Sequence, residues 1–197
     1  MKSLTKVFVA LLLAVTIAFS GFQTNANADE TNADFATPAA SPVSITIDVN
    51  QTIDQILGLI TSKQDFQLVV ANQTNDILTR VGAYNSLSNW PLGDVASLEA
   101  QFQDWTENGF GYFSFASNYA VGNTGKYFQF GASWPSIGSR KINLCTLNES
   151  GNKPAQKCWD AMSNSDDKNL TNSGFTGRAI MAKNNGKVQW AYQIRKQ

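Results

Sequence analysis

The chain has 197 residues, with 15 basic and 15 acidic side chains, two cysteines and no histidine. This balance lacks the excess of positive charge that non-specific nucleic-acid binding requires, so we expect no nucleic-acid partner. Without histidine there is no Ser-His or Cys-His pair, and the sequence has no phosphate-binding loop and no nucleophile elbow. We therefore expect a protein that is not an enzyme and that has no catalytic residues, cofactor or metal site.

Residues 1–28 have the pattern of a secretory signal peptide. The cationic start MKSLTK precedes the apolar run VFVALLLAVTIAF, and a small-x-small cleavage signal ends at Ala28. The apolar run is too short for a confident transmembrane helix. Cleavage would remove Lys2 and Lys6 but no acid, leaving 13 basic and 15 acidic residues and a net charge of −2. We expect a secreted protein with one domain.

The segment after the signal peptide is predicted to be a flexible leader, residues 29–43. Its sequence, DETNADFATPAASPV, is polar, rich in small residues and contains proline. The folded domain is then expected to span residues 44–197.

The start of this domain predicts an amphipathic helix of about three turns, placed before the first strand. Its apolar side chains recur at i, i+4, i+7, i+8 and i+11, namely Val49, Ile53, Ile56, Leu57 and Ile60. This face could pack on the domain or detach and lie in a membrane interface, and the scarcity of Lys and Arg favours packing.

From Phe66 the apolar pattern changes to a period of two, which predicts β-strands. The strand-like runs are FQLVVA, ILTRVGAY, SLEAQFQ, FGYFSFAS, KYFQFGAS, RKINLC, GRAIMAK and KVQWAYQI. The last two flank Asn184-Asn185-Gly186, a strong hairpin signal. In the final run Val188, Trp190, Tyr192 and Ile194 share one face, which predicts a half-buried antiparallel strand. The run KPAQKCWDAMSN predicts a second short helix. The expected fold is mainly β, an antiparallel sandwich with an N-terminal amphipathic helix.

The two cysteines, Cys145 and Cys158, are predicted to form a disulfide, because two thiols in an exported chain usually pair. Their loop is short, so a bridge would contribute ~3 kcal/mol by the chain-entropy estimate.

Aromatic residues are the most informative class for function. The pairs Phe113 with Phe115 and Phe128 with Phe130 have the alternation of inward-facing positions. Trp90 and Trp134 stand beside prolines in loop-like contexts. Either tryptophan could simply pack, or it could form a platform for a sugar, a choline group or a bilayer interface.

The order of these parts resembles the actinoporins, the pore-forming cytolysins of sea anemones, whose sandwich is shared with fungal fruit-body lectins. An amphipathic helix precedes LVVANQT, NGFGYFSF, GNTGKYFQFGASWP, a helix and the hairpin GFTGRAIMAKNNGKVQWAYQIRK. The resemblance covers about residues 45–197. It implies binding of a phosphocholine headgroup, preferably of sphingomyelin, and pore formation by insertion of the first helix from several copies of the chain.

The resemblance also implies which residues would do this. The headgroup pocket would be lined by Ser133 and Pro135 of a Ser-x-Pro element, together with Tyr112, Trp159 and Tyr84. The membrane-interface residues would be Trp134 and Trp90, and the pore helix would carry the five apolar residues named above. Three features depart from the family: Met162-Ser163-Asn164 stands where further tyrosines are expected, SIGSRK replaces the family's long aromatic loop after Ser-x-Pro, and the family lacks cysteines. A lectin-like, glycan-binding module without pore formation is therefore the alternative function.

Overall fold

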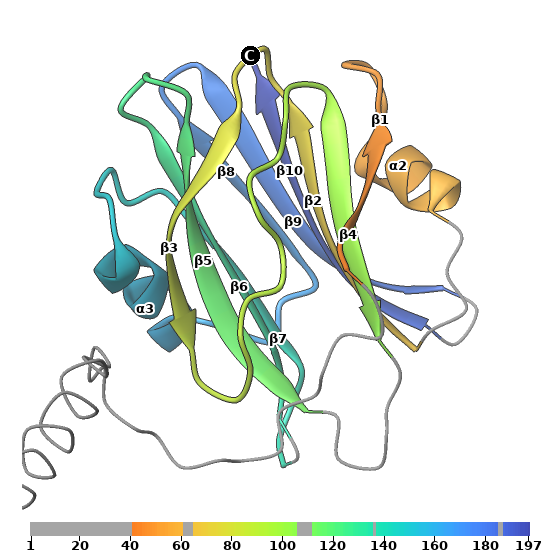
Figure 1. The fold of residues 1–197 in the computed structure, drawn as a ribbon. Coiled ribbons are helices and arrows are strands. Elements are labelled where there is room, and N and C mark those ends of the chain that lie inside the picture. The colour runs from red at the N-terminus through yellow and green to blue at the C-terminus, as the bar shows by residue number, and fades with distance from the viewer. Residues whose placement is uncertain (1–40, 61–64, 106–111, 136, 185–186) are drawn as a thin grey trace, which may run out of the picture. The chain divides into compact units, whose positions relative to one another are not determined.

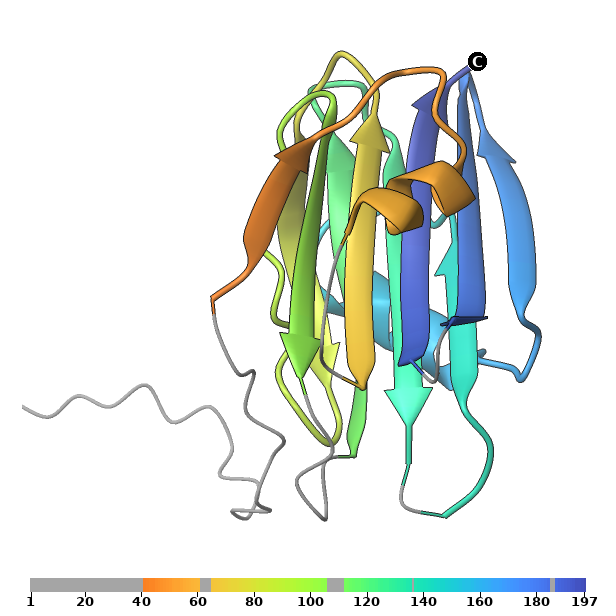
Figure 2. The same cartoon turned by 90° about the vertical axis from the view of Figure 1, so that its right-hand side faces the viewer.

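Two sheets packed face to face bury the alternating apolar side chains of the strands (Figures 1 and 2). The computed structural model describes residues 41–60, 65–105, 112–135, 137–184 and 187–197. The strands are β1 (Val43–Thr46), β2 (Phe66–Gln73), β3 (Leu78–Asn85), β4 (Glu99–Trp105), β5 (Phe113–Val121), β6 (Tyr127–Trp134), β7 (Lys141–Cys145), β8 (Asp167–Asn172), β9 (Phe175–Asn184) and β10 (Lys187–Lys196). The helices are α2 (Ile53–Leu59) and α3 (Asn152–Asp160).

One sheet has six strands in the order β1-β4-β2-β10-β9-β8, and the other has four in the order β3-β5-β6-β7. Neighbouring strands are antiparallel except β2 and β10, which run parallel. The predicted mainly β sandwich and the hairpin between β9 and β10 are confirmed. The prediction that the last strand is half-buried and purely antiparallel is wrong, since β10 is central and Gln189, Ala191 and Gln193 on its other face are also buried.

The core between the sheets consists mainly of aromatic side chains. The predicted inward positions of Phe113, Phe115, Phe128 and Phe130 are confirmed, because each is at most 1% exposed. Two tyrosines are also fully buried, and burial raises the pKa of both phenols: Tyr119 donates to Gly93 O at 2.9 Å, and Tyr192 donates to Gly131 O at 2.5 Å. The core therefore holds two hydroxyls that must stay protonated.

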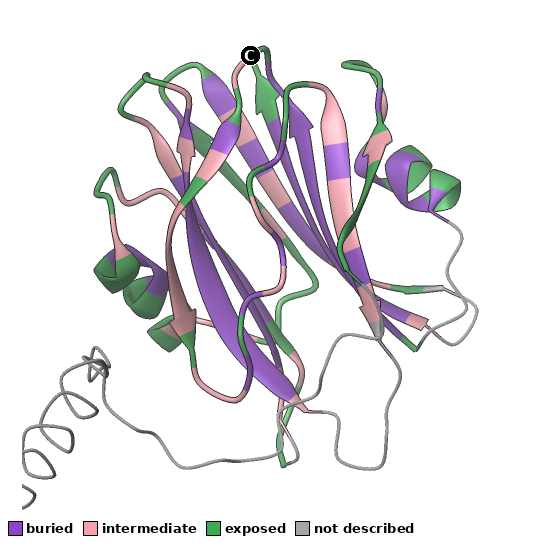
Figure 3. Ribbon diagram, in the orientation of Figure 1, coloured by how far each residue is buried: buried purple, intermediate pink, exposed green. Residues whose placement is uncertain are grey.

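Helix α2 lies on the outer face of the six-stranded sheet, with one side buried and one exposed (Figures 2 and 3). It begins at a capping box in which Thr52 Oγ1 accepts from Gln55 N and Gln55 Oε1 accepts from Thr52 N. The predicted three-turn helix is wrong in length, since α2 has seven residues, and strand β1 precedes it. Val49 lies before the cap and is 50% exposed, so it does not share the helix face.

Helix α3 lies on the outer face of the four-stranded sheet (Figure 1). It approaches β3 so closely that a Cβ on Gly82 would lie 2.2 Å from Gly151 O. The predicted helix over this segment is confirmed. The predicted signal peptide and most of the predicted leader lie outside the described residues, and Val43, the leader's last residue, is the first residue of β1.

Candidate functional site

A row of polar side chains crosses the outer face of the four-stranded sheet at one end. Ser114 pairs with Ser133, and Ser133 pairs with Lys141, so the three side chains share one face. Ser86 N and Leu87 N both donate to Ser114 O, which extends the row to the loop after β3. This row lies where β6 ends and β7 begins.

An aromatic pair stands beside this row. The rings of Tyr84, on β3, and Trp159, on α3, are 5.1 Å apart and tilted by 56°. Trp159 Nε1 donates to Ser114 Oγ at 2.8 Å, which fixes the indole over the sheet. Both aromatic side chains are half-buried, whereas Ser114 and Ser133 are only 3% and 4% exposed. A ligand at this site would meet the aromatic pair first.

The structure thus brings three predicted pocket residues together, Tyr84, Trp159 and Ser133, and Ser114 links Trp159 to Ser133. Sequence reasoning missed Ser114. Its signal was the alternation in FGYFSF, which puts Ser114 on the face opposite the core residues Phe113 and Phe115.

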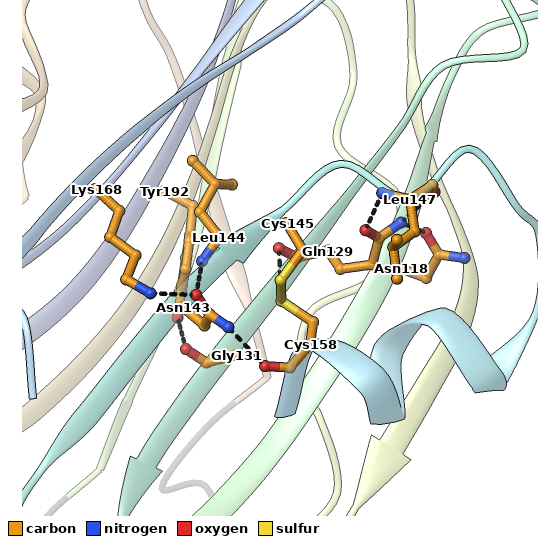
Figure 4. Close-up of a disulfide and its surroundings, with 10 residues drawn as sticks. All are labelled: Asn118, Gln129, Gly131, Asn143, Leu144, Cys145, Leu147, Cys158, Lys168 and Tyr192. Atoms are coloured by element: carbon orange, nitrogen blue, oxygen red, sulfur yellow. Dashed lines mark hydrogen bonds between the residues drawn. A yellow bond between two sulfur atoms is a disulfide. The ribbon is translucent and has the colours of Figure 1, made fainter. Parts of the chain in front are cut away.

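The position of Trp159 is fixed by how α3 is attached to the sheet. The predicted disulfide between Cys145 and Cys158 is confirmed, with the two Cα atoms 5.9 Å apart. Asn143 Nδ2 donates to Cys158 O at 2.8 Å (Figure 4). At the other end of the helix, Asn118 Nδ2 donates to Gly151 O at 3.1 Å. Because α3 is held at both ends and crosslinked next to Trp159, the aromatic pair is preorganised.

The Ser133-Trp134-Pro135 element is divided between the two faces of β6. Ser133 faces outward, whereas Trp134 faces the core, with its ring 4.3 Å from that of Phe66. The guanidinium of Arg140 lies 3.8 Å from the ring of Trp134, as a cation–π contact. Pro135 follows the strand and is half-buried. Trp134 therefore closes the end of the core and is itself half-buried.

Trp90 is a core residue, and its prediction as a membrane-interface residue is wrong. It is 4% exposed, and its indole N–H donates to Tyr119 Oη at 3.0 Å. Its ring packs on Phe115 at 5.2 Å between centroids. Burial and a satisfied donor leave this side chain no surface to offer a bilayer.

The loop after β6 presents an apolar residue that sequence reasoning missed. Ile137 is 89% exposed, more than any other large apolar side chain in the described part of the chain. It is followed by Gly138, whose φ of +109° suits glycine, and by the cations Arg140 and Lys141. The sequence signal was an isoleucine among Pro, Gly and Ser, where no neighbouring strand residue could cover it.

The remaining predicted residues are not all brought to this site. Tyr112 is half-buried just before β5 and makes no ring contact with Tyr84 or Trp159 within the described ranges. Phe110 and Gly111, the first two residues of the predicted strand run FGYFSFAS, lie outside those ranges. Of the predicted pore-helix residues, Ile53, Ile56, Leu57 and Ile60 are at most 7% exposed and pack on the other sheet.

Comparison with known proteins finds no family model that matches the chain and no curated protein that is similar to it. The resemblance to the actinoporins therefore stays a prediction. The disulfide is compatible with an exported protein, because such bridges persist in oxidising compartments. Within the residues that the structure describes, no helix has the length and apolar character needed to cross a membrane.

Proposed function

We propose that this is a secreted protein that binds the surface of lipid membranes, with the loop after β6 as its contact and the Tyr84–Trp159 pair as its headgroup site. The observation that carries the proposal is Ile137, an isoleucine 89% exposed in a loop that continues to Arg140 and Lys141. An exposed apolar side chain with basic neighbours suits the boundary between acyl chains and headgroups.

The magnitudes limit what the loop can do alone. Burying Ile137 in the acyl region would contribute ~2 kcal/mol, and each of Arg140 and Lys141 about 1 kcal/mol near an anionic surface. A total of about 4 kcal/mol corresponds to a dissociation constant of about 1 mM. Useful affinity therefore needs a second contact on the same surface.

The aromatic pair is the proposed second contact. The π faces of Tyr84 and Trp159 attract a quaternary ammonium group, and Lys141, beside Ser133, supplies a cation for the phosphate of phosphocholine. The same pair also supports the second candidate, a glycan-binding module, because sugars stack on half-exposed aromatic rings. Soluble phosphocholine and soluble sugars distinguish the two.

Pore formation by α2 is the part of the expected mechanism with least support from the geometry. The three buried apolar side chains of α2, together with Ile60 at its C-cap, would cost roughly 6–12 kcal/mol to expose. Seven helical residues rise about 10 Å, against about 30 Å of hydrocarbon. The protein is therefore proposed to bind the membrane surface without α2 spanning the bilayer.

The test is co-sedimentation of the purified protein with phosphatidylcholine vesicles, with and without sphingomyelin and an anionic lipid. Ile137→Asn should weaken binding roughly 10- to 30-fold, the equivalent of ~2 kcal/mol. Ile77→Asn is the matched control, since Ile77 is also exposed, at 45%, but lies in the turn between β2 and β3.

Tyr84→Ala separates the headgroup site from the loop, because it should abolish competition by soluble phosphocholine while leaving Ile137 in place. Equal binding by the Ile137→Asn and Ile77→Asn variants would refute the loop as the contact. Competition by sugars in place of phosphocholine would favour the glycan-binding module.

A further inference from the structure

The outer face of the six-stranded sheet, on the other side of the sandwich from the aromatic pair, carries a polar pocket. This pocket, of ≈ 110 Å³, opens between the start of α2 and strands β8, β9 and β10. It is lined by Thr52, Ile53, Asn169, Thr176, Arg178, Gln193 and Arg195.

The strand register explains why these polar side chains converge. Asn169 pairs with Arg178, and Arg178 pairs with Gln193, so the three form one row on the outer face of the six-stranded sheet. Thr176 pairs with Arg195 in the next row of the same face. The start of α2 forms the remaining wall.

The unused hydrogen-bonding groups of the pocket are mostly donors. Arg178 directs Nε and Nη2 to Asp167, at 3.3 and 2.8 Å, which leaves Nη1 free among the described residues. Gln193 Nε2 donates to Gln51 O and to Gln73 Oε1, and so only its oxygen is left for a ligand. The guanidinium of Arg195 forms no ion pair within the described part of the chain.

The charges near the pocket are nearly balanced except at Arg195. Asp167 forms a salt bridge with Arg178, and Asp54, exposed in the first turn of α2, also acts on Arg178. Arg195 forms no salt bridge with either aspartate among the described residues. A ligand would find one uncompensated guanidinium, the free Nη1 of Arg178 and the hydroxyls of Thr52 and Thr176.

We propose that this pocket binds a small ligand through an oxyanion group, a carboxylate, sulfate or phosphate, held by Arg195 with Arg178 and the two threonines. Guanidinium groups match the planar or tetrahedral oxygens of such groups. Because Thr52 belongs to the start of α2 and the arginines to the sheet, the bound ligand bridges the helix and the sheet.

The experiment is a titration of the intact protein with sodium phosphate, sulfate and citrate at constant ionic strength, followed by amide chemical shifts. Binding should give saturable shifts at Asn169, Thr176 and Gln193, and the ranking of the three salts identifies the preferred oxyanion. Arg195→Gln should weaken this binding at least 10-fold, and Thr176→Val by a smaller factor.

Lys196→Gln is the matched control, because it removes the same charge from the adjacent position on the opposite face of β10. Unchanged affinity in this variant and loss in Arg195→Gln support the site. Linear, unsaturable shifts, or equal weakening by both variants, would overturn it. If Arg195→Gln does not fold, the wild-type shifts still decide, since a saturable response away from the pocket also overturns the proposal.

Discussion

Removal of the disulfide should cost stability without displacing α3. The bridge between Cys145 and Cys158 closes a loop with a sequence separation of 13. The chain-entropy estimate for such a loop is ~3 kcal/mol of stability, lost when the unfolded chain gains freedom. The double variant Cys145→Ala/Cys158→Ala makes this change without leaving a polar group at Cys158, which is fully buried.

The folded state should keep its geometry because other bonds hold α3. Asn118 Nδ2 donates to Glu149 O at 2.8 Å and to Gly151 O, while Asn143 Nδ2 donates to Cys158 O. Trp159 keeps its hydrogen bond to Ser114 Oγ. The near-ultraviolet circular dichroism and any phosphocholine binding should therefore change little.

The assay is urea unfolding monitored by tryptophan fluorescence. With a slope of ~2 kcal/mol per M, a loss of ~3 kcal/mol lowers the midpoint by about 1.5 M. Wild-type protein unfolded in a reductant should coincide with the double variant, which controls for the alanines themselves. A midpoint shift below about 0.5 M, or loss of the near-ultraviolet signal without urea, would contradict the reasoning.

The core and the helices should also respond to pH and to substitution. Burial raises the pKa of Tyr119 and Tyr192, so above the ordinary tyrosine pKa of about 10 the unfolded chain loses phenol protons that the folded chain keeps. The free energy of unfolding should therefore fall by about 1.4 kcal/mol per pH unit for each of the two tyrosines. Urea unfolding from pH 9 to 11 should show this dependence on pH, and Tyr119→Phe should halve it. Gly82→Ala should lower the free energy of unfolding by ~2 kcal/mol or more, because the added Cβ would overlap Gly151 O. Gly93→Ala is the control in the same assay: its Cβ would meet no atom closer than Gln101 Oε1 at 3.9 Å, and it should cost under about 1 kcal/mol. Ile56→Asn should destabilise the domain by about 3 kcal/mol or more, because Ile56 is fully buried, whereas Val49→Asn at a 50% exposed position should cost under about 0.5 kcal/mol. Equal thermal midpoints for these two variants would show that α2 does not depend on its buried face.

The strands that sequence could predict are those with inward aromatic or branched residues at every second position. The Asn-Gly pair before Lys187 predicted the hairpin of β9 and β10 for the same local reason. Strands β1 and β8 were missed because they are short, largely exposed edge strands whose sequences, VSIT and DKNLTN, carry little apolar alternation. The pairing of β1 also depends on β4, a partner far along the chain, whereas β8 pairs with β9, the next strand.

The boundary of α2 was misplaced although a local signal existed. Counting apolar spacing extended the helix back to Val49, whereas the Thr52-x-x-Gln55 capping box marks where it begins. Capping is local chemistry and was available in the sequence. Ile60, in contrast, is buried although its backbone is extended, so the apolar pattern continued past the end of the helix.

The candidate site was harder to predict because it depends on which face each aromatic residue occupies. Trp90 and Trp134 have similar local contexts, yet Trp90 donates to Tyr119 inside the core and Trp134 lies at its end beneath Arg140. A proline next to a tryptophan in the sequence does not tell whether the tryptophan lies inside the core or at its end. Only the packing of β5 against the loop before β4 decides that Trp90 is covered.

The two helices differ in how a ligand would act on them. Helix α3 is crosslinked by the disulfide and hydrogen-bonded at both ends. A ligand on Trp159 therefore binds a site that is already ordered, and little conformational entropy is lost on binding. Helix α2 is held without a covalent link, by its apolar face and by the buried Gln73 and Gln193, whose amides both donate to Gln51 O. A ligand in the pocket at the start of α2 adds to these contacts only when the helix is docked, so it must stabilise the docked state. Ligand binding therefore shifts the docking of α2 rather than that of α3, and an oxyanion would oppose any release of α2 at a membrane.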